Sequence, residues 1–143
     1  MYEYRATLRR VVDGDTVDVD IDCGFDIVLS NQRIRLYGID TPECRTRDPE
    51  EKKCGLLAKK FIEENLPTTF TLRTRLDGKG KYGRILGELV THYKEFDREM
   101  SLNKVMIMKN LAVEYYGQSK EEIEEQHLAN REILYESGMV VRG

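Results

Sequence analysis

The chain has 143 residues, of which 40% are hydrophobic and 34% charged, and its formal net charge at pH 7 is −3. This composition is typical of one globular domain, here residues 1–143, and argues against a disordered chain. The net charge excludes a protein that coats nucleic acid by bulk positive charge. No apolar run approaches the ~18 residues of a membrane-spanning helix, so we expect no membrane partner.

The N-terminus and the cysteines bear on the compartment. The first five residues contain no apolar stretch of the kind found in secretory signals. We therefore expect a cytoplasmic protein, or one from a phage or mobile element, or a secreted one if a leader has been removed. Cys23, Cys44 and Cys54 are odd in number and have no close spacing, which favours a reducing compartment over a disulfide framework. A zinc site made by these three is disfavoured because no CxxC spacing occurs.

Short strands are predicted in the first half of the chain. Residues 2–8 and 17–21 alternate between apolar and polar side chains, which is typical of strands with one buried face. Further strands are predicted at residues 27–29, 33–39, 70–76 and 85–90. Short strands separated by glycine-containing turns, with one helix among them and two at the end, predict a small closed barrel.

The first predicted helix has its apolar core at residues 56–62 and ends before Pro67. Asp48 and Pro49 have the character of an N-cap and a first helical residue. Alternatively, they form a loop ahead of a helix that begins near Cys54.

Two more helices are predicted towards the C-terminus. One runs from Glu99 or Ser101 to about residue 109, followed by Asn110, which suits a left-handed position. The other begins at Ser119, which forms a capping box with Glu122, and ends before residue 138.

Charge is unevenly distributed along the chain. Residues 70–84 carry five cationic side chains against Asp77, whereas residues 114–136 carry seven glutamates against two cations. A positive segment on a negative body indicates an anion-binding site, although a solvated strand edge would show the same pattern.

Three short motifs carry residues suited to phosphate chemistry. Residues 13–16, DGDT, place two carboxylates around a glycine, and these are hard oxygen ligands suited to Ca²⁺ or Mg²⁺. A simple turn or β-bulge would also use Asp and Gly there. The nearby Asp18, Asp20 and Asp22 do not fit an EF-hand loop, because Cys23 replaces its glycine, and we expect them on the exposed face of a strand.

The second motif, residues 33–43, brings arginines, Asp40 and Glu43 together at a strand end. It supplies a phosphate clamp, a metal ligand and a base. The third motif, residues 80–84, places a lysine, a tyrosine and an arginine among glycines. These can hold a phosphate and stack a base, although a hairpin turn would look similar.

Taken together, the three motifs resemble the staphylococcal nuclease family. DGDT at 13–16, RLYGIDTPE at 35–43 and KYGR at 81–84 occur in that family's order and spacing, and the resemblance covers roughly residues 5–136. It implies an α+β fold that is mainly β, a five-stranded OB-fold barrel with three helices. It also implies a monomeric nuclease that binds one Ca²⁺ and hydrolyses DNA, RNA or both to products with 3′-phosphate ends.

The resemblance also implies roles for individual residues. Asp15 and Asp40 would be the metal-binding carboxylates, with the carbonyl of Thr41 as a third ligand and Asp13 behind them. Glu43 would orient or deprotonate the attacking water. The remaining implied residues are two phosphate clamps, Arg35 and Arg84, and three nucleotide-binding residues, Lys81, Tyr82 and Tyr116.

The chain departs from the family pattern in several places. The 17–34 and 91–99 segments are longer, and Gln118 stands where the family has a second pocket tyrosine. Either longer segment could be an extended hairpin that reshapes the groove. We expect His92 and His127 to be structural or surface residues. Two rival functions are a catalytically weak OB-fold module that binds nucleic acid or peptide, and a structural OB domain whose Asp and Arg residues form ion pairs.

Overall fold

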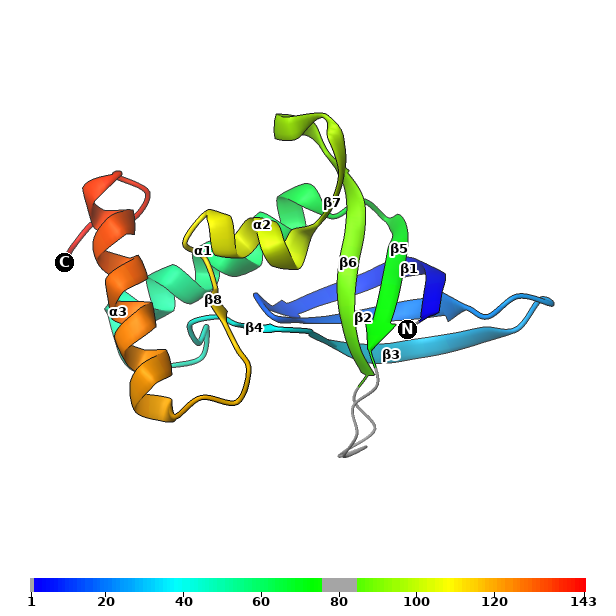
Figure 1. Ribbon diagram of the computed structural model, residues 1–143, viewed down its shortest axis with the longest axis horizontal. Helices are drawn as coiled ribbons and strands as arrows, with labels where there is room; N and C mark the ends of the chain where they lie inside the picture. The colour runs from blue at the N-terminus through cyan, green and yellow to red at the C-terminus, as the bar shows by residue number, and fades with distance from the viewer. Residues whose placement is uncertain (1, 76–84) are drawn as a thin grey trace.

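A computed structural model of the chain describes residues 2–75 and 85–143 (Figure 1). Its elements, in chain order, are β1 (Tyr2–Asp13), β2 (Thr16–Asp22), β3 (Val28–Leu36), β4 (Ile39–Asp40), α1 (Pro49–Asn65), β5 (Thr69–Arg75), β6 (Ile85–Tyr93), the 3-10 turn η2 (Lys94–Phe96), β7 (Arg98–Ser101), α2 (Leu102–Met108), β8 (Val113–Glu114) and α3 (Lys120–Glu136). Within this part of the chain, every helix is too short or too polar to cross a membrane.

Five of the strands close into a barrel. β1 pairs antiparallel with β2 and β5, β2 pairs with β3, and β5 pairs with β6. A parallel pairing of residues 34–36 in β3 with residues 85–87 in β6 closes the ring. Fully buried residues such as Val17, Val19, Ile34, Leu72 and Leu89 fill its interior. For the described residues, the predicted five-stranded OB-fold barrel with three helices is confirmed.

Helix α1 follows β4 and packs against β1 of the barrel. The side chain of Asp48 accepts hydrogen bonds from the backbone N–H groups of Glu50 and Glu51, and Pro49 is the first helical residue. The predicted Asp48–Pro49 N-terminus is therefore confirmed over the later start near Cys54. Ala58 is fully buried and attaches the helix to the core.

The two C-terminal helices lie close to their predicted positions. α2 begins at Leu102 because residues 98–101 pair with β6 as strand β7, so the expected start at Glu99 is wrong. Asn110 has the predicted left-handed φ of 63°, and the Ser119 hydroxyl accepts a hydrogen bond from the N–H of Glu122. α3 lies at the end of the molecule opposite the β2–β3 hairpin (Figure 1).

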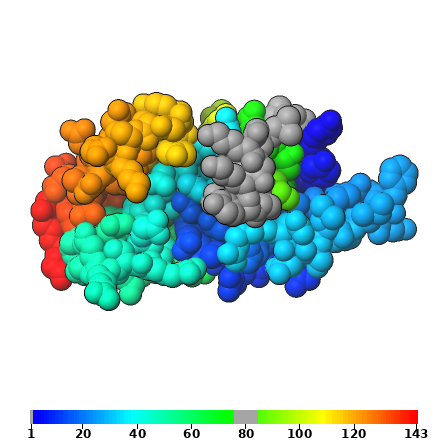
Figure 2. All heavy atoms as spheres, turned by 90° about the horizontal axis from the view of Figure 1, so that it is seen from below, coloured from blue at the N-terminus to red at the C-terminus, as the bar shows by residue number. Residues whose placement is uncertain are grey.

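The long 17–34 segment forms the expected extended hairpin. Beyond the barrel it projects as an arm (Figure 2). Phe25, in the turn between β2 and β3, is 97% exposed. In the described part of the chain, neither the arm nor the 91–99 segment contributes a residue to the cleft that lies between the 40–51 segment and α3.

The expected exposed face of β2 is wrong for Asp18. This residue is 8% exposed, and its carboxylate accepts hydrogen bonds from Arg33 at 2.9 and 3.2 Å. The hydrogen bond from Arg33 lowers the pKa of Asp18 below its ordinary value, against the effect of burial. Asp18 thus serves an ion pair between neighbouring strands.

Candidate active site

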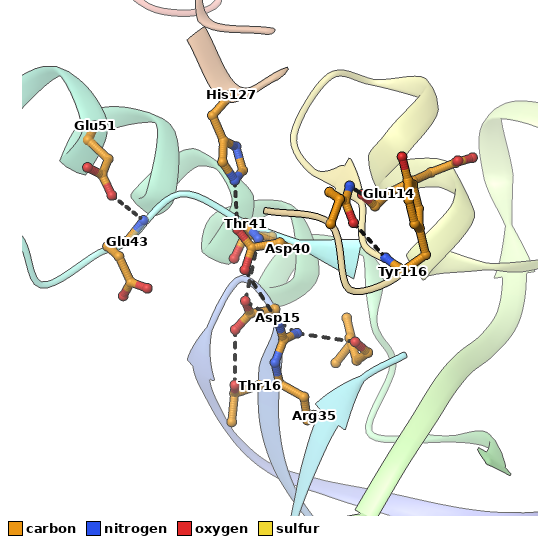
Figure 3. Close-up of polar contacts among 12 residues, drawn as sticks. Asp15, Thr16, Arg35, Asp40, Thr41, Glu43, Glu51, Glu114, Tyr116 and His127 are labelled. Atoms are coloured by element: carbon orange, nitrogen blue, oxygen red, sulfur yellow. Dashed lines mark hydrogen bonds and ion pairs between the residues drawn. The ribbon is translucent and has the colours of Figure 1, made fainter. Parts of the chain in front are cut away.

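Two carboxylates from distant parts of the chain meet at Arg35 (Figure 3). Asp15 lies in the turn between β1 and β2, and Asp40 ends β4. Arg35 Nη1 lies 3.3 Å from Asp15 Oδ2, and Arg35 Nη2 lies 3.5 Å from Asp40 Oδ1. The backbone N–H of Thr41 also points to Asp15 Oδ2, at 3.4 Å. We refer to Asp15, Arg35 and Asp40 as the carboxylate–arginine cluster.

Strand register positions each member of this cluster. Thr16 in β2 pairs with Arg35 in β3, and the N–H of Leu36 donates to the carbonyl of Asp15 at 2.8 Å. Asp40 is held by the pairing of β4 with β8, in which it lies opposite Val113. Arg35 and Asp40 therefore stand on strands, and Asp15 lies in a tight turn held by the adjoining strand pair, which favours precise geometry.

Helix α1 supports both loops that carry the carboxylates, and two glycines permit the close packing. A Cβ on Gly14 would lie 2.7 Å from the Cβ of Ala58. A Cβ on Gly55 would lie 2.5 Å from the carbonyl oxygen of Glu43. Because such approaches leave no room for a methyl group, the glycines bring the DGDT turn and the 40–43 loop against the same helix.

Glu43 lies beside the cluster on this loop, where its side chain is solvent-exposed and its backbone N–H donates to Glu51 at 3.1 Å (Figure 3). Although the residue as a whole is exposed, neighbouring protein atoms shield its carboxyl from part of the solvent, and this raises the pKa of Glu43. The charges of Asp15, Asp13 and Asp40 raise this pKa further. Asp15, Asp13 and Asp40 therefore lie close enough to Glu43 for their charges to act on its carboxyl.

Carboxylate oxygens gathered in this way are the ligands that a hard divalent cation prefers. Asp15 and Asp40 contact the same guanidinium, so their carboxylates converge on one place in the site. Within residues 2–75 and 85–143, no three Asp, Glu, His or Cys side chains gather closely enough to enclose a metal by themselves. A cation here would therefore need other oxygen ligands, such as a backbone carbonyl and water.

His127 on α3 makes a contact that we did not expect from the sequence. Its Nε2 lies 2.7 Å from Asp40 Oδ2, and its side chain is 14% exposed (Figure 3). The expectation of a merely structural or surface residue is thus incomplete, because His127 touches the cluster. A signal was present in the sequence: His127 falls on the inward stripe of α3 that Ile123 and Leu134 define at helical spacing.

A cleft of about 680 Å³ opens beside the cluster, between the 40–51 segment and α3. Its lining includes Arg35, Asp40, Thr41, Glu43, Tyr115, Gln118 and His127. Tyr116, predicted to bind nucleotide, is 73% exposed and lies next to this lining.

Gln118, at the position where the family has a second tyrosine, holds the local turn. Its side-chain oxygen accepts from the N–H of Tyr116 at 2.8 Å, and its amide donates to the carbonyl of Glu114 at 2.7 Å. The other predicted substrate contacts, Lys81, Tyr82 and Arg84, lie outside the described residues.

Part of the predicted positive segment is already neutralised. Glu88 in β6 is 4% exposed and accepts hydrogen bonds from Arg73 at 3.3 Å and Arg75 at 3.0 Å. The guanidinium of Arg75 also lies over the ring of Tyr37, 5.1 Å from its centroid. These two arginines stabilise the outer face of the barrel and leave less charge for phosphates than the sequence indicates.

The closed barrel and the carboxylate–arginine cluster define an OB-fold domain of the nuclease-homologue type. A family model described as staphylococcal nuclease homologue matches residues 33–134. The chain belongs to the staphylococcal nuclease family. Asp13 and Asp15 lie before the matched range. The pairing of β2 with β3 places Asp15 next to Arg35, which lies inside that range.

Two relatives extend the comparison. The chain is 38% identical over 81 residues to the Thermonuclease of Staphylococcus intermedius, a match that covers 55% of this chain and 44% of that protein. It is 29% identical over 96 residues to Endonuclease YhcR of Bacillus subtilis (strain 168), which covers 62% of this chain and 8% of that protein. The matched part thus spans less than half of either relative.

Proposed function

We propose that the chain is a Ca²⁺-dependent nuclease that hydrolyses phosphodiester bonds in DNA, RNA or both and leaves 3′-phosphate ends. The observation that carries this proposal is the convergence of Asp15 and Asp40 on Arg35, with Glu43 beside them. Membership of the staphylococcal nuclease family and the names of the two relatives support the same reaction class.

In this proposal Asp15, Asp40 and the carbonyl of Thr41 hold one Ca²⁺, with Asp13 behind them. The donor set is all oxygen and carries more negative charge than Arg35 balances, which suits a hard cation with an irregular oxygen shell. When bound, the ion supplies positive charge beside the phosphoryl oxygens of the substrate.

The arginines bind the phosphate and stabilise the charge that develops on it during the reaction. Negative charge grows on the equatorial phosphoryl oxygens during in-line attack by water, and a fixed guanidinium fork donates two hydrogen bonds to such oxygens. Arg35 and Arg84 are the proposed forks. Each contact of this kind is typically worth roughly 3–4 kcal/mol in the barrier.

Glu43 accepts or directs the proton that the attacking water loses. Its raised pKa brings it closer to neutral pH than an ordinary glutamate, which improves a general base. Water adds to phosphorus as the bond to the 5′ oxygen breaks, and that oxygen takes up a proton. The products are a 3′-phosphate and a 5′-hydroxyl.

Nucleotide binding is assigned to the exposed ring of Tyr116 and to Lys81 and Tyr82. An exposed aromatic ring beside a cleft can stack any base, which suits a nuclease without strict sequence preference.

Digestion of 5′-labelled DNA and RNA oligonucleotides in Ca²⁺, followed by mass spectrometry of the fragments, tests the proposal. We expect fragments that end in 3′-phosphate and begin with 5′-hydroxyl. Fragments with 5′-phosphates would contradict the direction of attack. Binding of the oligonucleotide without cleavage would instead support the catalytically weak binding module.

A further inference from the structure

We propose that His127 is a positioning residue that fixes the carboxylate of Asp40 for cation binding. This inference rests on the proposed function, because it takes Asp40 as a metal ligand. The observation behind it is the 2.7 Å contact between His127 Nε2 and Asp40 Oδ2, made across 87 positions of sequence. His127 lines the same cleft as Arg35 and Asp40.

The two oxygens of Asp40 have different partners. Oδ2 is bound by His127, whereas Oδ1 lies 3.5 Å from Arg35 on the side of Asp15 (Figure 3). The histidine therefore sets the rotation of the carboxylate about its own axis. Because Oδ2 contacts the imidazole, Oδ1 is the oxygen that faces Arg35 and Asp15.

The position of His127 is fixed by contacts near its base. Asn130, one turn further along α3, donates to the carbonyl of Ala112 at 3.2 Å and accepts from the side chain of Asn110 at 3.2 Å. Ala112 immediately precedes β8, the strand that pairs with Asp40. The helix that carries the imidazole is thus bonded to the segment leading into β8, and β8 in turn pairs with β4, the strand that carries Asp40.

Burial distinguishes this histidine from the second one in the chain. The side chain of His127 is 14% exposed, and its Nδ1 is buried with no hydrogen-bond partner among the described residues. Its contact with Asp40 is therefore the interaction that orients the ring. His92 is 57% exposed and lies 3.1 Å from Asp97, which is 91% exposed. A surface pair of that kind contributes little, so His92 offers a control.

Hydrogen-bonding partners that orient a metal ligand typically account for 10- to 100-fold in metal affinity. We therefore expect the loss of His127 to weaken Ca²⁺ binding by roughly that factor. Because positioning acts on affinity, saturating Ca²⁺ should restore much of kcat. A purely structural role for His127 would lower the Tm without changing Ca²⁺ affinity.

The test is calorimetric titration of Ca²⁺ into the whole chain and its variants. His127→Gln places an amide N–H near the position of Nε2 and should bind Ca²⁺ almost as well as the wild type. His127→Asn places its amide near Nδ1, away from Asp40, and should be as weak as His127→Leu. His92→Leu should match the wild type. If His127→Leu does not fold by circular dichroism, the Gln and Asn pair carries the comparison.

The outcomes separate this inference from the proposed function. Wild type that binds and cleaves with Ca²⁺, together with a His127→Asn variant of unchanged or tighter Ca²⁺ affinity, would overturn the inference alone. A His127→Gln variant as weak as His127→Asn would do the same. Wild type that binds no Ca²⁺ at all would overturn both.

Discussion

The guanidinium of Arg35 lies 3.3 Å from the carboxylate of Asp15, with both side chains less than one-fifth exposed. In this position Arg35 neutralises an acidic turn, whereas the proposed reaction needs it to face a phosphate. A cation bound between Asp15 and Asp40 would supply the positive charge that Arg35 now provides. Under the proposed function, cation binding would therefore free Arg35 to contact a phosphate.

Replacing Arg35 by lysine should remove most of the nuclease activity while the fold survives. Lysine keeps the charge but not the planar fork, so it cannot donate two parallel hydrogen bonds to one phosphate. Loss of such a contact is expected to cost about 10²–10³ in kcat. Arg33→Lys, on the same strand but paired with Asp18, should keep its activity. Near wild-type kcat in a folded Arg35→Lys variant would show that Arg35 is no phosphate clamp.

Gly55→Ala should disturb the 40–43 loop, which packs against Gly55 of α1. The added methyl group would meet the backbone of Glu43 and Pro42, which cannot move aside as a flexible side chain can. We expect a loss of roughly 1–3 kcal/mol in unfolding free energy, as for overpacked cores, and a lower kcat in the molecules that fold. Denaturant unfolding and cleavage rates measure the two effects. Lys52→Ala, at an exposed position of the same helix, is the control and should change neither.

Glu43→Gln should stabilise the cation-free protein at neutral pH. Because the pKa of Glu43 is raised in the folded state, folding is most favourable when this group is protonated, and stability is lost as pH rises through the folded pKa. The neutral amide removes that loss. Thermal unfolding in EGTA should therefore give a higher Tm for Glu43→Gln than for wild type at pH 7, and the difference should shrink toward about pH 4.

Glu64→Gln, on the exposed side of α1, provides the comparison for Glu43→Gln and should show no such pH-dependent gain. A Glu43→Gln variant with wild-type Tm at pH 7 would mean that neither burial nor the neighbouring carboxylates raise the pKa of Glu43 in the folded protein. Its nuclease activity should fall on the order of 10²–10⁴-fold with the loss of the base.

Tyr116→Ala should weaken substrate binding more than it slows the reaction. A base stacked on an aromatic ring contributes ~1–3 kcal/mol, so KM should rise by roughly one to two orders of magnitude. Steady-state kinetics on a short oligonucleotide separate KM from kcat. Tyr2→Ala, an exposed tyrosine on β1, should leave both values unchanged. An unchanged KM with a sharply lower kcat for Tyr116→Ala would argue against a binding role.

Local signals in the sequence were sufficient for much of the fold. Two-residue alternation identified most of β1, β2 and β5, and Asp48 and Ser119 marked the two long helices because N-caps act on adjacent backbone groups. Residues 27–29 and 33–39, predicted as two strands, instead form one continuous strand, β3 (Val28–Leu36), and the short β4. The start of α2 was less accessible. Residues 98–101 pair with β6 as a strand, and nothing in the local sequence of these four residues indicates that tertiary contact.

In the candidate site too, some features could be predicted from the sequence and others could not. Asp15, Arg35 and Asp40 were identified from motif order, and the structure brings them together. The contact of His127 with Asp40 depends on where α3 packs, which no local pattern determines. The ion pairs of Glu88 with Arg73 and Arg75 likewise depend on the pairing of β5 with β6.

The most direct test of the account is the initial rate of oligonucleotide cleavage as a function of free Ca²⁺, for wild type and Asp40→Ala. We predict no cleavage by wild type in excess EGTA with Mg²⁺ present, and a rate that rises with Ca²⁺ to saturation. Asp40→Ala should need much more Ca²⁺ and recover part of the rate at high concentration. Undiminished cleavage in EGTA, or an Asp40→Ala curve that overlies the wild type, would contradict a Ca²⁺ site built on this carboxylate.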